Sequence, residues 1–211
     1  DNSSSQELGL SDALTHYVSS ITRVRMVCVG PKAIELAVES WVAEKLSLPL
    51  ERVVVCEEVE GVVNPYSDPA SLGADRWTAV LAASRLGREC VLVVDCGSAI
   101  TIDMLHGKRY LGGYIAPGYN LMRRALFKDT ANVRPADVSL PSVAPGANTS
   151  DCVHSGLWLA LLGLVAQSKE SLACESGVPA DRVVVVLCGG DAAGLRSLLP
   201  FDVQLEPDLV L

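Results

Sequence analysis

Apolar positions along the chain form two kinds of pattern, short β-branched runs and longer stripes with helical spacing. The short runs predict strands at residues 24–29, 52–56, 90–95, 99–105, 109–115, 182–187 and 201–205. The stripes predict helices at residues 11–21, 31–46, 75–86, 119–127 and 149–174. Strands that alternate with helices in this way are typical of an α/β fold.

The element order changes at about residue 89. Three consecutive strands follow on short turns, at residues 96–98 and 106–108, and predict an antiparallel meander. The order from there on, three strands, helix, loop, helix, strand, helix, strand, resembles the ribonuclease H-like domain of the actin, hexokinase and Hsp70 superfold. That domain occurs as two similar lobes with a nucleotide between them. We therefore expect residues 1–88 to form a first lobe without its opening meander, and residues 89–211 to form the second lobe.

Composition and charge narrow the class of protein. The 211 residues are 49% apolar and 20% charged, which suits one large globular domain or two small ones. A net charge of −8 disfavours general binding to nucleic acid or to an anionic membrane. The longest apolar run, residues 156–166, is shorter than a bilayer span, and the N-terminus has no signal-peptide pattern. We expect a soluble, cytoplasmic protein without nucleic-acid or membrane partners.

The cysteines and histidines predict no metal site of their own. The seven cysteines include no C-x-x-C pair, and several lie inside apolar runs, where a reduced thiol packs as a small hydrophobic group. His16, His106 and His154 have no second ligand at zinc spacing.

The sharpest local motif is D-C-G-S-A-I-T at residues 95–101, where one predicted strand turns into the next. Glycine lets a backbone approach an oxyanion closely, successive backbone N–H groups can hold a phosphate, and a carboxylate at the strand end can hold Mg²⁺. The motif is neither a Walker loop nor a Rossmann turn. Its alternative interpretation is an ordinary hairpin turn that contains a glycine.

A second motif, G-A-D-R, begins the helix predicted from residue 75, with N-P-Y just upstream. Asp75 and Arg76 stand side by side at the positive end of a helix, which suits a base and a clamp for an acidic substrate. The alternative is a helix-start acid beside a solvated charge. Two further glycine-rich motifs are L-C-G-G-D at residues 187–191 and Y-L-G-G-Y-I-A-P-G at residues 110–118.

These motifs, together with L-M-R-R-A-L, P-G-A-N-T and Thr130 with the alanine after it, resemble the type III pantothenate kinases in order and spacing. That family also includes the Bvg accessory factor, a regulatory homologue. The resemblance runs from about residue 11 to residue 211. It implies phosphorylation of pantothenate by ATP, with Mg²⁺ and a monovalent cation, either K⁺ or NH₄⁺, in a homodimer.

The resemblance also implies residue roles. Asp75 matches the general base that takes the proton from the substrate hydroxyl. Substrate-binding positions are matched by Tyr66, Gly73, Arg76, Thr130 and Thr149, with Arg76 or Thr149 reaching across the dimer interface. The metal position is matched by Asp95, and the nucleotide positions by Gly97, Ser98, Thr101, Gly189, Gly190 and Ala192.

Two departures from the family pattern matter. Ser98 stands where the family usually has threonine, and it keeps a hydroxyl. The family's first phosphate motif, Asp-x-Gly-Asn-Thr on an N-terminal strand, does not occur in the 211 residues. We expect a preceding segment to supply it, and the alternative is a non-catalytic regulatory homologue. The apolar helix at residues 156–166 is the candidate dimer interface.

Overall fold

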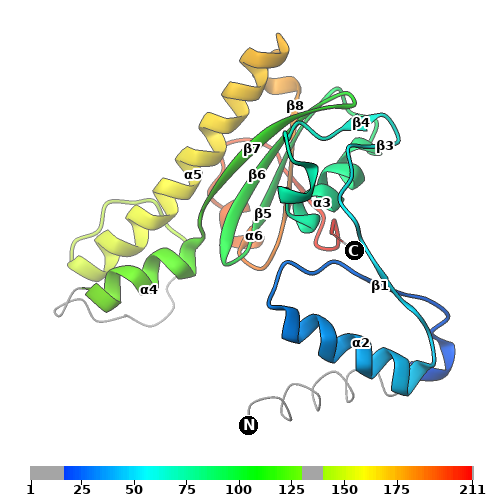
Figure 1. Cartoon of the computed structure of the whole chain (residues 1–211). Coiled ribbons are helices and arrows are strands. Elements are labelled where there is room, and N and C mark those ends of the chain that lie inside the picture. Colours follow the sequence, from blue (N-terminus) through cyan, green and yellow to red (C-terminus); the bar gives the residue numbers. More distant parts are fainter. Residues whose placement is uncertain (1–16, 130–139, 211) are drawn as a thin grey trace.

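The computed structural model describes residues 17–129 and 140–210. Most of the helix expected at residues 11–21 therefore lies outside the described residues, apart from a single 3₁₀ turn, η1 (Val18–Ser20). Figure 1 shows a large sheet with helices on both sides and a small N-terminal unit beside it.

The large sheet has seven strands in the order β3-β4-β7-β6-β5-β8-β9. Their bounds are β3 (Glu58–Val59), β4 (Val62–Val63), β5 (Cys90–Cys96), β6 (Ala99–His106), β7 (Arg109–Pro117), β8 (Val183–Cys188) and β9 (Gln204–Leu205). Strands β5, β6 and β7 form the expected antiparallel meander, while β8 pairs in parallel with β5 and β9 in parallel with β8. The predicted α/β class is confirmed, with the meander and its two added parallel strands in the ribonuclease H-like arrangement.

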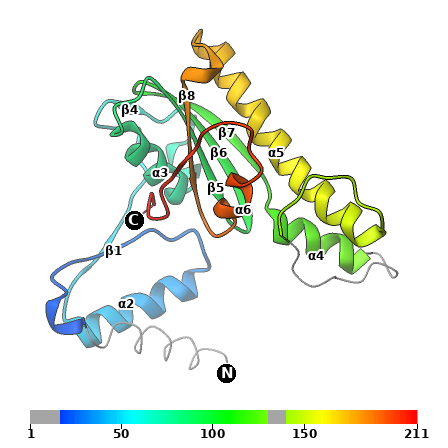
Figure 2. The same ribbon diagram turned by 180° about the vertical axis from the view of Figure 1, so that it is seen from behind.

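Alternate side chains of the central strand pack on opposite faces of the sheet. Leu92 and Val94 belong to the core beneath α5 (Thr149–Ser176) and α6 (Ala192–Arg196). Val91 and Val93 belong to the core beneath α3 (Ala74–Ser84). All four are at most 1% exposed, as expected for a strand covered on both sides. Figure 2 shows the same three layers from behind.

The predicted helix α5 is the longest of the described elements. The Asn148 side chain caps its start by accepting from the Asp151 backbone N–H, and Gly177 ends it in the left-handed conformation, with φ of 69°. Its length and composition would allow it to cross a membrane, which for one helix is weak evidence. Leu161, Val165 and Leu172 pack into the core of the sheet, so one face of the helix serves as a core element. The shorter α4 (Tyr119–Asp129) packs against α5.

The N-terminal unit is a parallel pair, β1 (Val24–Met26) and β2 (Leu50–Arg52), joined by α2 (Lys32–Leu46). The strand predicted at residues 24–29 is therefore too long, and the strand predicted at residues 52–56 is displaced, because it shares only Arg52 with β2. Val29 and Val54 are 64% and 74% exposed, so in the part of the chain that the structure describes no second layer covers these positions. The short hairpin of β3 and β4 lies between the strand predicted at residues 52–56 and the helix predicted at residues 75–86, where no element was predicted and where η2 (Pro69–Ser71) also lies.

Part of the expected first lobe packs on the large sheet. Strand β4 pairs with β7, and α3 covers β5 and β6. The proposed division at residue 88 stays a prediction.

Candidate active site

Asp75 lies in the first turn of α3, directly after Gly73 and Ala74. Its carboxylate accepts a hydrogen bond from the backbone N–H of Arg76 at 2.7 Å, and the helix end favours the negative charge. A Cβ atom on Gly73 would lie 2.6 Å from Asp75 Oδ1. The glycine therefore leaves the space that this carboxylate orientation needs.

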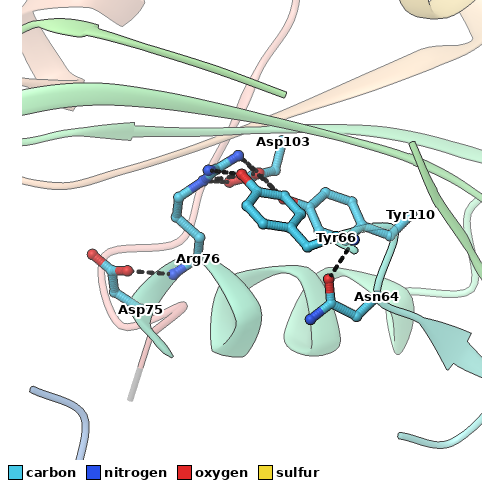
Figure 3. Close-up of polar contacts among 6 residues, drawn as sticks. All are labelled: Asn64, Tyr66, Asp75, Arg76, Asp103 and Tyr110. Atoms are coloured by element: carbon cyan, nitrogen blue, oxygen red, sulfur yellow. Dashed lines mark hydrogen bonds and ion pairs between the residues drawn. The ribbon is translucent and has the colours of Figure 1, made fainter. Parts of the chain in front are cut away.

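Arg76 points the other way, into the protein. Its side chain is 6% exposed and forms an ion pair with Asp103, whose side chain is 1% exposed. The Arg76 Nη1 donates to the Tyr66 hydroxyl at 2.8 Å, and Nη2 donates to the Tyr110 hydroxyl at 3.1 Å. Figure 3 shows the cluster of Tyr66, Arg76, Asp103 and Tyr110 above α3. The interpretation of Arg76 as a solvated surface charge is wrong.

Burial governs the electrostatics of this cluster. Burial raises the pKa of the Asp103 carboxyl, and the hydrogen bond and charge of Arg76 offset this only in part. For Arg76 itself, burial acts to lower the pKa, but hydrogen bonding and charge from Asp103 outweigh it and the pKa is raised. The pair is therefore held together where neither charge is well hydrated.

Asp95 lies at the end of β5, opposite Thr101 on β6. Burial raises the pKa of the Asp95 carboxyl, and the negative charges of Asp75 and Asp103 raise it further. Because strand side chains alternate, Asp103 points to the same side of β6 as Thr101, which is the side that α3 covers. The charge of Asp75, the expected base, therefore acts on Asp95, the expected metal ligand.

The turn after Asp95 is held by backbone from two distant segments. The Gly118 N–H donates to the Ser98 carbonyl at 2.9 Å, and the Asp191 N–H donates to the Cys96 carbonyl at 3.0 Å. A Cβ on Gly118 would lie 2.9 Å from the Ser98 carbonyl oxygen, which is too close for a real contact. The motifs at residues 110–118 and 187–191 therefore meet at the turn of residues 95–101.

Gly189 is the second glycine that this junction requires. Its φ is +85°, and a Cβ there would lie 2.7 Å from the Cys96 carbonyl oxygen. Gly190 follows it, and Ala192 begins α6. A pocket of about 710 Å³ opens at the junction, lined by Gly97, Ser98, Gly190 and Asp191 on one side and by residues of α4 on the other.

The basic residues of α4 were not predicted as part of this site. Arg123, Arg124 and Lys128 line the pocket together with Asn120, whose amide donates to the Asp191 carboxylate at 3.4 Å. The sequence signal available was the basic pair in L-M-R-R-A-L, which by itself is typical of an exposed helix face.

The structure brings together some expected substrate residues and not others. Tyr66, Gly73 and Arg76 lie around the first turn of α3 with Asp75. Thr149 is exposed at the start of α5, on the other side of the sheet from α3 (Figure 1). Thr130 lies outside the described residues. Within one chain, Thr149 is therefore apart from Asp75.

Asp103, Tyr110 and Asn64 complete the site. Asp103 was missed, whereas Asn64 and Tyr110 were noted only as members of the N-P-Y and Y-L-G-G-Y-I-A-P-G motifs, without a role of their own. The Asn64 side chain accepts from the Tyr66 backbone N–H at 3.0 Å and donates to two backbone carbonyls, which fixes the loop before α3. The available signal was Asp103 itself, an acidic residue in the middle of an otherwise apolar strand pattern.

Comparison with known proteins identifies the family. A family model described as type III pantothenate kinase matches residues 1–170. The chain belongs to the type III pantothenate kinase family. A type III pantothenate kinase of Ectopseudomonas mendocina is 38% identical over 212 residues, which cover 96% of this chain and 82% of the relative.

Other relatives agree. A type III pantothenate kinase of Acinetobacter baylyi is 36% identical over 175 residues, covering 81% of this chain and 66% of the relative, and one of Acinetobacter baumannii is 35% identical over 167 residues, covering 79% and 64%. The chain thus spans about two thirds of the length of these two Acinetobacter kinases. The structure of a conserved putative Baf family transcriptional activator from Campylobacter jejuni matches 93% of this chain and 82% of its own, with a TM-score of 0.56 and 20% identity, which shows a shared fold.

Proposed function

We propose that this protein transfers the γ-phosphoryl group of ATP to the primary hydroxyl of pantothenate, the first step of coenzyme A biosynthesis. Family membership supports the proposal. The observation that carries it is that the Asp75 carboxylate, at a helix start, interacts electrostatically with Asp95 at the glycine-rich turn. Phosphoryl transfer needs mainly positioning and charge neutralisation, which such a pair and turn can supply.

In this mechanism Asp75 accepts the proton of the pantothenate hydroxyl. The hydroxyl oxygen then forms a bond to the γ-phosphorus, while the bond between that phosphorus and the bridging oxygen of ADP breaks. ADP leaves with the electron pair. Gly97, Ser98 and Gly190 line the same pocket, where Gly97 and Ser98 would face the phosphates and Gly190 the adenosine.

The residues suit a magnesium ion that keeps part of its water shell better than a metal ion held by protein side chains alone. Among residues 17–129 and 140–210, no three His, Cys, Asp or Glu side chains are grouped to hold a metal. Mg²⁺ commonly keeps several waters and uses one or two carboxylates plus substrate phosphates. Asp95 is the carboxylate that would hold it, and when bound the ion would neutralise charge on the phosphates. A monovalent cation, K⁺ or NH₄⁺, belongs to the proposal on the resemblance alone.

The assembly and location are part of the same proposal. Thr149 lies away from Asp75 within one chain, so it would reach a substrate only from a second copy. The homodimer would use α5, where Leu159 on the face away from the sheet is 54% exposed. We propose a cytoplasmic homodimer, in keeping with a metabolic kinase.

The test is ADP release by the protein with ATP, Mg²⁺ and K⁺ or NH₄⁺, with and without pantothenate. Asp75→Asn should lower kcat by about 10²- to 10⁴-fold, the range typical for loss of a general base. Asp181→Asn, which changes an exposed aspartate outside the site, is the matched control and should keep full turnover. Pantothenate-dependent turnover that survives in Asp75→Asn would refute the assignment. Pantothenate binding without turnover in the wild type would instead favour a regulatory homologue.

A further inference from the structure

Tyr119, the first residue of α4, forms a polar contact with α5 that the proposed chemistry does not use. Its hydroxyl oxygen lies 2.6 Å from His154 Nδ1, and the other ring nitrogen, His154 Nε2, lies 2.9 Å from the Leu140 carbonyl oxygen. A carbonyl oxygen only accepts, so Nε2 carries the proton that it donates to Leu140. In the neutral ring Nδ1 is then an acceptor, and Tyr119 donates to it. His154 thus joins the start of α4 to the segment before α5.

Aromatic packing gives this contact a defined geometry. The Tyr119 ring stacks on Trp158, with ring centroids 4.6 Å apart and 15° between the planes, and it meets the His154 ring edge-on at 5.7 Å. Trp158 is 5% exposed, and a Cβ on Gly194 of α6 would lie 2.8 Å from its Cη2. Burial raises the pKa of the Tyr119 hydroxyl, so the hydroxyl keeps the proton that it donates. The start of α4 is therefore held against α5 by stacking and by one directed hydrogen bond.

The neighbouring face of α4 lines the pocket at the glycine-rich turn. Asn120, Arg124 and Lys128 follow one another at intervals of four residues, so they share one face of the helix, and all three line the pocket. Tyr119 and Met122 instead pack against the core beneath α5. Figures 1 and 2 show α4 lying beside α5. The seating of α4 on α5 therefore decides where the cationic side chains of this face lie relative to the turn.

We propose that His154 and Tyr119 are positioning residues for nucleotide binding, whose hydrogen bond seats α4 so that its cationic face lies opposite the glycine-rich turn. The inference rests on the proposed function only in placing the phosphates of ATP in this pocket. Positive charge across from the turn attracts a polyphosphate, and this attraction falls with distance. Loss of the bond lets the start of α4 shift, and the cost falls on ATP. Pantothenate is affected less, because Asp75 and the residues around it lie at α3, away from α4 (Figure 1).

The experiment measures the dissociation constant of ATP with Mg²⁺ by isothermal titration calorimetry, together with kcat and KM for pantothenate. The variants are Tyr119→Phe, His154→Ala and the double variant. Tyr119→Phe keeps the ring that stacks on Trp158 and removes only the hydroxyl. Each single variant should raise the ATP dissociation constant about two- to tenfold, the effect of one hydrogen bond, and leave KM for pantothenate unchanged. The double variant should match His154→Ala, because both changes remove the same bond.

His154→Asn tests for rescue by a conservative change. The side-chain oxygen of asparagine takes the place of Nδ1 as the acceptor for Tyr119, whereas the shorter side chain does not reach Leu140. ATP binding should therefore return to within about twofold of the wild type. The matched control is His106→Ala, which changes a half-buried histidine at the end of β6 away from the turn. It should leave both constants unchanged.

Four results would overturn the inference. They are an unchanged ATP dissociation constant in Tyr119→Phe, an equal rise in KM for pantothenate, effects that multiply in the double variant, and ATP binding in His154→Asn as weak as in His154→Ala. The last result would show that the bond to Leu140 matters and the bond to Tyr119 does not. A purely structural role gives the first result, together with a lower melting temperature.

The wild-type protein separates this inference from the proposed function. ATP binding without pantothenate-dependent ADP release would refute the proposed function, while the ATP titrations of the variants would still decide the inference. A wild-type protein that does not bind ATP would refute both.

Discussion

Replacing Gly73 with alanine should damage turnover while barely changing stability. The new Cβ would lie 2.6 Å from Asp75 Oδ1, whereas carbon and oxygen atoms without a bond between them need roughly 3.3 Å, so the carboxylate must move by about 0.7 Å. The Gly73 backbone has φ of −59° and ψ of 133°, which alanine adopts without strain. A displacement of 1 Å at a reacting group can cost about 100-fold in rate, so we expect kcat to fall by about 10- to 100-fold.

The assay is steady-state ADP release together with thermal unfolding of the same preparations. The melting temperature should change little, because the atom displaced is the end of a side chain and not backbone. Gly30→Ala is the matched control, since its new Cβ would meet only Cys28 Sγ at 3.9 Å. The reasoning fails if Gly73→Ala keeps the wild-type kcat, or if Gly30→Ala loses as much activity.

Two further predictions concern stability. Asp95→Asn should be more stable than the wild type at pH 7, because the folded state raises the Asp95 pKa. The advantage should shrink as the pH falls through the folded pKa and vanish below about pH 3, where aspartate is protonated in both states, and urea unfolding at pH 7 and pH 3 measures it. Lower stability of the variant at pH 7 would contradict this. Arg85→Ala breaks an ion pair between Arg85 and Glu60, whose side chains are 62% and 49% exposed, so thermal unfolding should show almost no change in melting temperature.

The spacing of apolar residues within each segment predicted the helices and strands that bury one face along their own length. The meander and helices α2 to α5 follow from apolar periods of two and 3.6, which a buried face enforces along each segment. The strands β3 and β4 have two residues each; β3 pairs with β4, and β4 pairs with β7, which lies far along the chain. No pattern within such a short segment can predict that pairing.

The candidate site also has one part that local motifs predict and another that depends on contacts between distant segments. The turn at residues 95–101 and the helix start at Asp75 are local motifs, and the glycines that form them are visible in sequence. The role of Asp103 depends on Arg76, 27 residues earlier in the chain, and on the layer order that places α3 over β6. An acidic residue in an apolar strand indicates a buried partner, but the sequence does not say which one.

The ion pair between Arg76 and Asp103 joins the helix that carries the expected base to the sheet that carries the expected metal ligand. Asp103 belongs to β6, the strand paired with the one that ends at Asp95, while Arg76 belongs to the helix that begins with the base. The two carboxylates at the site are therefore carried by elements that a buried ion pair links directly. A substitution that breaks the pair would loosen the helix that carries Asp75 from the sheet that carries Asp95, so damage deep in the core would reach the spacing of these two carboxylates.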